Sequence, residues 1–231
     1  MSRAKIRAKI HLAIYDMDKT VTRRPTYTPF LIHAARTREP WRLLLLPFVA
    51  VTILLYGARL IDRGRLKELS HTLLIGRALP AAEAVTLALS FASETLGENI
   101  LAPAQARIAA DKAAGYRMVL ATASYEFYAG AIGRALGFDD IIGTMTRTDT
   151  AGALLARIAE QNCYGTAKLE MVEAWMTRQG LARGDCHVRF YSDHVSDAPC
   201  LNWADEAFAT NPHAPLAALA AQRGWDVLDW R

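Results

Sequence analysis

The stretch Ile10-His11-Leu12-Ala13-Ile14-Tyr15-Asp16-Met17-Asp18-Lys19-Thr20 indicates both the fold of the chain and the place of its chemistry. Its apolar first half predicts a buried β-strand, and its polar second half predicts the loop at the carboxyl end of that strand. In open α/β sheets, ligands bind beyond these carboxyl ends, so we expect Asp16 and Asp18 at the functional edge. Two neighbouring carboxylates can take different catalytic roles, here Asp16 as nucleophile and metal ligand and Asp18 as general acid and base. A turn or helix cap built from the same acids is the alternative.

Composition narrows the class of protein. With 231 residues, the chain can form one large domain, or a core domain with a substantial insertion. A formal net charge of +4 fits an anionic substrate or membrane surface and is too small to indicate nucleic-acid binding. The three cysteines, Cys163, Cys186 and Cys200, lack metal-binding spacing and indicate a reducing compartment. No secretory signal is visible, so we expect a cytoplasmic location.

The order of predicted elements indicates the architecture. Residues 23–102 contain no convincing strand and many proline and glycine breaks, which predicts an all-helical domain inserted after the first strand. Residues 1–22 and 103–231 are expected to form the core, an α/β fold with a doubly wound, Rossmann-like, mostly parallel sheet. Strands are predicted over 10–15, 116–122, 141–144, 186–192, 206–210 and 225–228, and helices over 103–114, 125–136 and 167–178.

The apolar run 43–56 within the insertion needs its own interpretation. It is shorter than the roughly 20 residues of a spanning helix, and Pro47 interrupts it. Arg42 and Arg59 flank it on both sides, so it shows no charge asymmetry across a membrane. We expect a helix buried in the insertion, and a face that contacts a membrane or a second copy of the chain is the alternative.

Polar residues also follow the second core strand and begin a later helix. Thr122 ends a strand, and the backbone N–H groups of Ala123 and Ser124 lead into a helix N-terminus, which is an anion-binding arrangement. Lys168 is expected in the first turn of a helix, where a cation is electrostatically disfavoured. A solvated lysine is its simpler interpretation.

A second acidic pair follows the strand over 186–192. Asp193 and Asp197 lie four residues apart, so both can face one point at the end of that strand. Oxygen ligands from Asp16, from a backbone carbonyl near Asp18, and from Asp193 would suit Mg²⁺. Together these elements predict a phosphoryl-transfer site at one edge of the sheet.

These residues resemble the motifs of the haloacid dehalogenase (HAD) superfamily of phosphohydrolases, over nearly the whole chain. Residues 16–20 look like its DxDxT first motif, Thr122 its second, Lys168 its third, and Asp193-x-x-x-Asp197 its fourth. The helical insertion is similar to a C1-type cap. Further stretches resemble the phosphoserine-phosphatase-like subfamily IB, namely 122–124, 136–138, 162–165, 191–193 and 211–212.

The resemblance implies a phosphatase that forms an aspartyl-phosphate on Asp16, with Asp18 as acid and base. Mg²⁺, Lys168, Thr122 and nearby N–H groups would neutralise the phosphoryl oxygens. Asp197 would orient Lys168 or a metal-bound water. The expected site residues are Asp16, Asp18 and Lys168 (catalytic), Thr20, Arg23, Thr122, Ala123 and Ser124 (phosphate or substrate), Asp16, Asp18 and Asp193 (metal), and Asp197 (supporting).

The substrate is expected to be a small or amphiphilic organic phosphate. Phosphoserine phosphatases hold the substrate's ammonium with an acid after the first motif and its carboxylate with a cap arginine. Residues 23–28 offer no acid, and residues 70–74 offer no arginine, so the apolar cap favours a larger or lipid-like ester. The alternatives are a phosphoserine phosphatase proper, and a non-hydrolytic signalling or membrane-associated protein that carries an aspartyl-phosphate.

Overall fold

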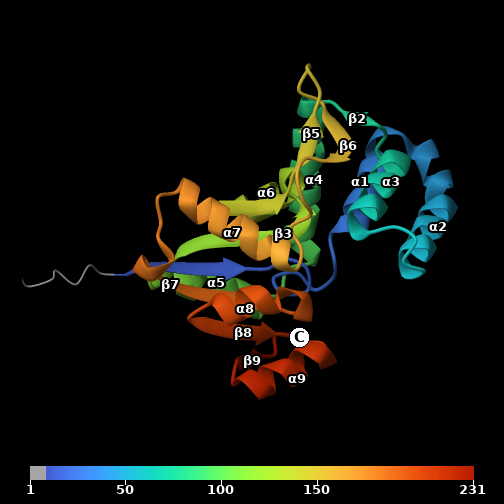
Figure 1. Ribbon diagram of the computed structural model, residues 1–231. Coiled ribbons are helices and arrows are strands. Elements are labelled where there is room, and N and C mark those ends of the chain that lie inside the picture. Colours follow the sequence, from blue (N-terminus) through green and yellow to red (C-terminus); the bar gives the residue numbers. More distant parts are fainter. Residues whose placement is uncertain (1–8) are drawn as a thin grey trace, which may run out of the picture.

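A six-stranded parallel sheet forms the centre of the molecule (Figure 1). The structure is a computed structural model and describes residues 9–231, so the first eight residues of the predicted core segment 1–22 lie outside the described residues. The strand order is β4-β3-β1-β7-β8-β9, with β1 in an inner position, which confirms the doubly wound α/β fold. The strands are Ile10–Tyr15 (β1), Arg117–Tyr125 (β3), Asp140–Thr144 (β4), Cys186–Ser192 (β7), Glu206–Thr210 (β8) and Asp226–Leu228 (β9).

Both faces of this sheet are covered, which explains why β1 is apolar along most of its length. Ala13 and Tyr15 belong to a hydrophobic cluster shared with α5 and α6, whereas Leu12 and Ile14 belong to a second cluster shared with α7, α8 and α9. Successive side chains of a strand point to opposite faces, so each face of β1 is buried under its own layer of helices. The helices are Ala102–Ala113 (α5), Glu126–Ala135 (α6), Thr166–Arg178 (α7), Ala198–Trp203 (α8) and Ala214–Arg223 (α9).

The inserted segment stands beside the carboxyl edge of the sheet (Figure 1). Its last helix packs along α6, where the rings of Phe91 and Tyr128 meet edge to face at 5.8 Å. This contact attaches the insertion to the core. The elements are Tyr27–Arg38 (α1), the 3₁₀ helix Pro40–Leu45 (η1), Leu46–Gly57 (α2), Arg63–Leu74 (α3), Ala78–Leu79 (β2) and Ala81–Glu98 (α4).

The expectation of an all-helical insertion is wrong at β2. This strand pairs antiparallel with Leu154–Ile158 (β6), which pairs antiparallel with Thr146–Thr148 (β5), so a small second sheet joins the insertion to a hairpin of the core. A two-residue strand has no periodicity to detect, and the hairpin strands are short and partly exposed.

The expectation that the apolar run 43–56 is a buried helix is also wrong. Only Val49 and Thr52 are buried in α2, and both Phe48 and Leu54 are exposed. By length and composition alone, Pro40–Gly57 could cross a membrane, and only 11% of it is buried inside the protein. An apolar run predicts that its side chains contact another apolar surface. It does not say whether that surface belongs to the rest of the protein, to a membrane or to another molecule.

Candidate active site

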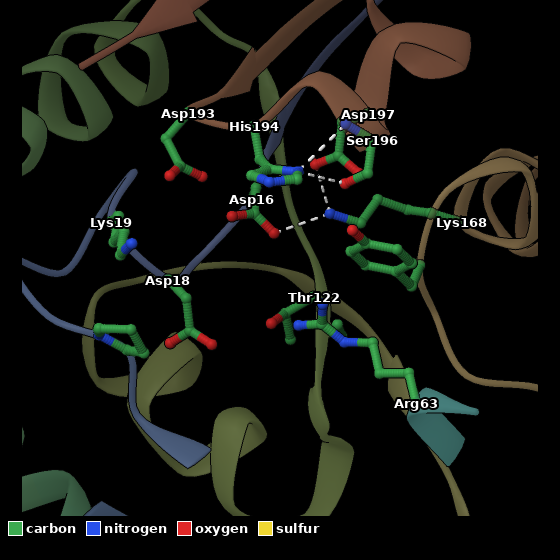
Figure 2. Close-up of a pocket in the computed structure, with 13 residues that line it drawn as sticks. Asp16, Asp18, Lys19, Arg63, Thr122, Lys168, Asp193, His194, Ser196 and Asp197 are labelled. Atoms are coloured by element: carbon green, nitrogen blue, oxygen red, sulfur yellow. Dashed lines mark hydrogen bonds and ion pairs between the residues drawn. The ribbon is translucent and has the colours of Figure 1, made fainter. Parts of the chain in front are cut away.

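The predicted acids meet in one pocket of about 230 Å³ at the carboxyl edge of the sheet (Figure 2). They come from the ends of β1 and β7, two strands that pair directly in the sheet, and β3 contributes Thr122 from the other side of β1. The pocket is lined by Asp16, Asp18, Lys19, Pro25, Arg63, Thr122, Ala123, Tyr164, Lys168, Asp193, His194, Ser196 and Asp197.

Lys168 bridges the two acidic loops. Its Nζ lies 2.7 Å from Asp16 Oδ1 and 2.6 Å from Asp197 Oδ2, and its side chain is only 2% exposed (Figure 2). Ser192 Oγ donates a further hydrogen bond of 2.8 Å to Asp197 Oδ2. Gly165, with a φ of +64°, ends the preceding loop and lets α7 begin so that Lys168 points into the pocket. The simpler interpretation of Lys168 as a solvated lysine is therefore wrong.

The pocket carries more buried negative charge than one lysine can balance. Burial raises the pKa of Asp16 to about 8, Lys168 opposes this shift, and Asp197 and Asp193 add to it. Burial and Asp197 raise the pKa of Asp193 to about 6. Burial acts to lower the pKa of Lys168, but Asp16 and Asp197 outweigh it and hold that pKa well above its usual value, so Lys168 is a cation. Acids that burial and mutual repulsion hold partly protonated near neutral pH form a site suited to a further cation.

Asp18 is held apart from this cluster. Thr26 donates to Asp18 Oδ1 from both its backbone N–H and its hydroxyl, each at 2.8 Å, and Ser124 Oγ donates to Asp18 Oδ2 at 3.1 Å. These three donors orient the carboxylate away from Lys168, as Figure 2 shows. The two acids of the first motif therefore have different surroundings, which is the condition for different roles.

Only some of the other residues predicted to bind phosphate or substrate line the pocket. Thr122 and Ala123 line the pocket, whereas Ser124 is buried behind it against Asp18. Thr20 is buried and lies 3.4 Å from Asp16 Oδ2 through its hydroxyl. Arg23 does not line this pocket and instead lines a neighbouring hollow with Asn211 and Arg231.

The donor set fits a hydrated divalent cation. Among residues 9–231, no three His, Cys, Asp or Glu side chains form a cluster that could hold a metal ion. The Asp193 carboxylate lines the pocket and accepts no hydrogen bond from the described residues. Mg²⁺ usually takes one or two carboxylates and completes its shell with water and phosphate oxygens. Asp16, Asp193 and the backbone carbonyl of Asp18 could hold such an ion.

Two cap residues that the sequence did not single out reach the site. Arg63 lines the pocket, and its guanidinium lies 4.1 Å from the centre of the Tyr164 ring. Residues 70–74 hold no arginine, as the sequence indicates, but Arg63 at the start of the same helix supplies a cap arginine at the pocket. Lys67, one turn further along α3, is 4% exposed, and its Nζ lies 2.7 Å from Asn162 Oδ1. Burial and Arg63 lower the pKa of Lys67 to about 7.

The fold and the site together define an α/β protein with a buried aspartate–lysine pair at the carboxyl edge of its sheet. The chain belongs to the haloacid dehalogenase-like hydrolase family, whose model matches residues 13–202.

Three relatives illustrate the similarity. A phosphoserine phosphatase of Mycobacterium tuberculosis is 35% identical over 118 residues, 51% of this chain and 37% of that protein. A protein of Mycobacterium tuberculosis named as a probable phosphatase is 28% identical over 226 residues, 94% of this chain and 75% of that protein. A protein of unknown function from Bordetella pertussis Tohama I has a TM-score of 0.86 and 26% identity, with 96% of this chain and 100% of that chain covered. Curated relatives such as the first are matched over less than two fifths of their length.

Proposed function

We propose that the chain is a Mg²⁺-dependent phosphomonoester hydrolase that works through an aspartyl-phosphate on Asp16. The observation that carries this proposal is the position of Lys168 Nζ, 2.7 Å from Asp16 and 2.6 Å from Asp197, in a pocket that Thr122 also lines. Positioning and charge stabilisation dominate phosphoryl transfer, and this pocket offers cationic and backbone donors beside a carboxylate nucleophile. Phosphatase-named relatives support the same reaction class.

In the first step, an Asp16 carboxylate oxygen attacks phosphorus, the ester P–O bond breaks, and the leaving oxygen takes a proton from Asp18. In the second step, Asp18 takes a proton from water, the water oxygen attacks phosphorus, and Asp16 and phosphate separate. Lys168 and Thr122 hold the phosphoryl oxygens. A bound Mg²⁺ would supply charge neutralisation beside Asp16 and Asp193.

The substrate is a small or amphiphilic phosphate ester. Arg63 favours a substrate with a second anionic group close to the phosphate, which makes phosphoserine phosphatase the second candidate. Residues 23–28 contain no acid for the ammonium of phosphoserine, and this favours the first candidate. Comparing hydrolysis of phosphoserine with that of lysophosphatidate separates the two. We place the enzyme in a reducing compartment, which its three buried, unpaired cysteines support.

The test is hydrolysis of an aryl phosphate with and without Mg²⁺, by the wild type and by Asp16→Asn. We expect Mg²⁺-dependent activity in the wild type and none in the variant. Acid quenching followed by intact-mass measurement should detect one added phosphoryl group in the wild type alone. Asp226→Asn, at an exposed acid of β9, is the matched control. Equal activity of Asp16→Asn and wild type would exclude the mechanism.

A further inference from the structure

The cap carries a concentration of exposed apolar side chains. Nine of the fifteen exposed large hydrophobic residues of the described chain fall within residues 41–60, and three of the other six lie on α4. We call this surface the α2 face; it consists of Trp41, Leu44, Leu46, Phe48, Val51, Ile53, Leu54, Tyr56 and Leu60. A patch of this kind on a soluble domain marks a contact surface.

The α2 face is anchored to the cap along one side only. Thr52 is buried and lies 3.5 Å from Ser70 Oγ through its hydroxyl, which ties α2 to α3. Figure 1 places α2 at the outer edge of the cap, away from the central sheet. One side of α2 is fixed to α3, and a 3₁₀ segment precedes the helix. The helix can therefore lie in the plane of a membrane surface more easily than it can span the membrane.

The segment around the α2 face is rich in arginine, with six arginines and two acids in residues 36–65. Three of these arginines (Arg38, Arg42 and Arg65) form ion pairs with glutamates, whereas the exposed Arg36 and Arg59 pair with no acid of the described chain. No acid occurs between Glu39 and Asp62. Trp41 and Tyr56, whose amphipathic rings favour membrane–water interfaces, lie near the two ends of the face.

We propose that the α2 face docks the enzyme on an anionic lipid bilayer. Apolar side chains would enter the boundary between headgroups and acyl chains, and the exposed Arg36 and Arg59 would contact anionic headgroups. A symmetric dimer through the same face would instead bring two copies of Arg59 together on a segment that has no acid between Glu39 and Asp62, which is unfavourable.

Shared lining residues connect the α2 face to the active site. Tyr56, Leu60 and Asp62 line one hollow, and Asp62 also lines a second hollow together with Arg63 and Tyr164. These last two residues line the active-site pocket as well. Docking would therefore bring the mouth of the pocket close to the lipid surface. The docking itself does not depend on the proposed reaction.

The test is flotation of the full chain with vesicles of phosphatidylcholine, alone or mixed with phosphatidylglycerol. We expect binding to the mixed vesicles that weakens as salt is raised. Changing Leu44, Phe48 and Leu54 together to Gln should weaken this binding about tenfold or more, and Arg59→Gln about fivefold. Val85→Gln with Leu89→Gln, on the exposed side of α4, is the matched control and should bind as the wild type does.

A thermal melt of each variant shows whether it is folded. The vesicle-binding result can therefore be interpreted even if no phosphatase activity is found. Wild type that stays with the unbound fraction overturns the proposal, as does equal binding by the triple variant. A wild-type dimer in gel filtration that the triple variant converts to monomer, without vesicle binding, would assign the α2 face to a second copy instead.

Discussion

Lys67 of the cap helix α3 donates a hydrogen bond to the backbone carbonyl of Ala123, in the wall of the active-site pocket. Its Nζ also bonds to Asn162, in the loop that precedes Lys168. Lys67 is 4% exposed, so an amine of the inserted segment is buried against two loops of the core. Because Ala123 directly follows Thr122, this contact positions the segment that we propose binds phosphate.

Replacing Lys67 by Met should lower kcat/KM about tenfold, because small displacements of a phosphate-binding segment are costly in catalysis. The measurement is steady-state hydrolysis of an aryl phosphate, with a thermal melt of each protein. Arg65→Met, at an exposed arginine of the same helix, should leave kcat/KM unchanged. A folded Lys67→Met protein with wild-type kcat/KM would show that the contact has no positioning role.

Replacing Arg63 by Met should raise KM selectively for esters that carry a second anion. The guanidinium lines the pocket and is held over the Tyr164 ring. A charge-assisted hydrogen bond to an anion contributes about 1.5–3 kcal/mol, so KM should rise about tenfold or more. The comparison is phosphoserine against 4-nitrophenyl phosphate, whose KM should change less. An equal change for both esters would place Arg63 against the phosphate itself.

Added Mg²⁺ should raise the melting temperature at pH 7.5, and Asp193→Asn should abolish that rise. At about 100 times its Kd, a ligand stabilises the folded state by about 2.7 kcal/mol. The pKa of Asp16 is raised to about 8 and that of Asp193 to about 6, so protons compete with the metal increasingly as pH falls through these values, and the shift should shrink at pH 5. Asp226→Asn should keep the full shift. A shift that survives in Asp193→Asn would move the metal site elsewhere.

Replacing His71 by Phe should stabilise the protein and flatten its response to acid. Both ring nitrogens of His71 are buried without a hydrogen-bond partner among residues 9–231, and the ring packs edge to face on Tyr125 at 5.5 Å. The phenylalanine ring has no polar atom that needs a partner, so His71→Phe should add about 1–3 kcal/mol to the free energy of unfolding.

The direction of the acid response follows from proton binding. Burial and Arg38 lower the pKa of His71 from 6.5 to about 4, so the unfolded chain binds more protons between these values. Stability is therefore lost as pH falls through this window. Urea unfolding at pH 4.5 and 7 should show a smaller difference for His71→Phe than for the wild type. An equal difference would assign the acid sensitivity to another group.

The core elements could be predicted because each leaves a strong local pattern. Strands 10–15, 186–192 and 206–210 match the structure, since apolar runs with polar ends are typical of buried parallel strands. The hairpin of β5 and β6 was missed because short, partly exposed strands carry no such pattern. The strand over 116–122 continues to Tyr125, through the irregular register that places Thr122 and Ala123 at the pocket.

The acids and the lysine of the site could be identified from the sequence alone, because residues at the ends of neighbouring parallel strands and at a helix start meet at one sheet edge. The contribution of the cap became visible only in the folded chain. Lys67 and Arg63 reach the core because α3 packs against the loops around Ala123 and Tyr164, which is a contact between distant segments. The same packing leaves the α2 face exposed, since an apolar run has the same composition whether it turns inward or outward.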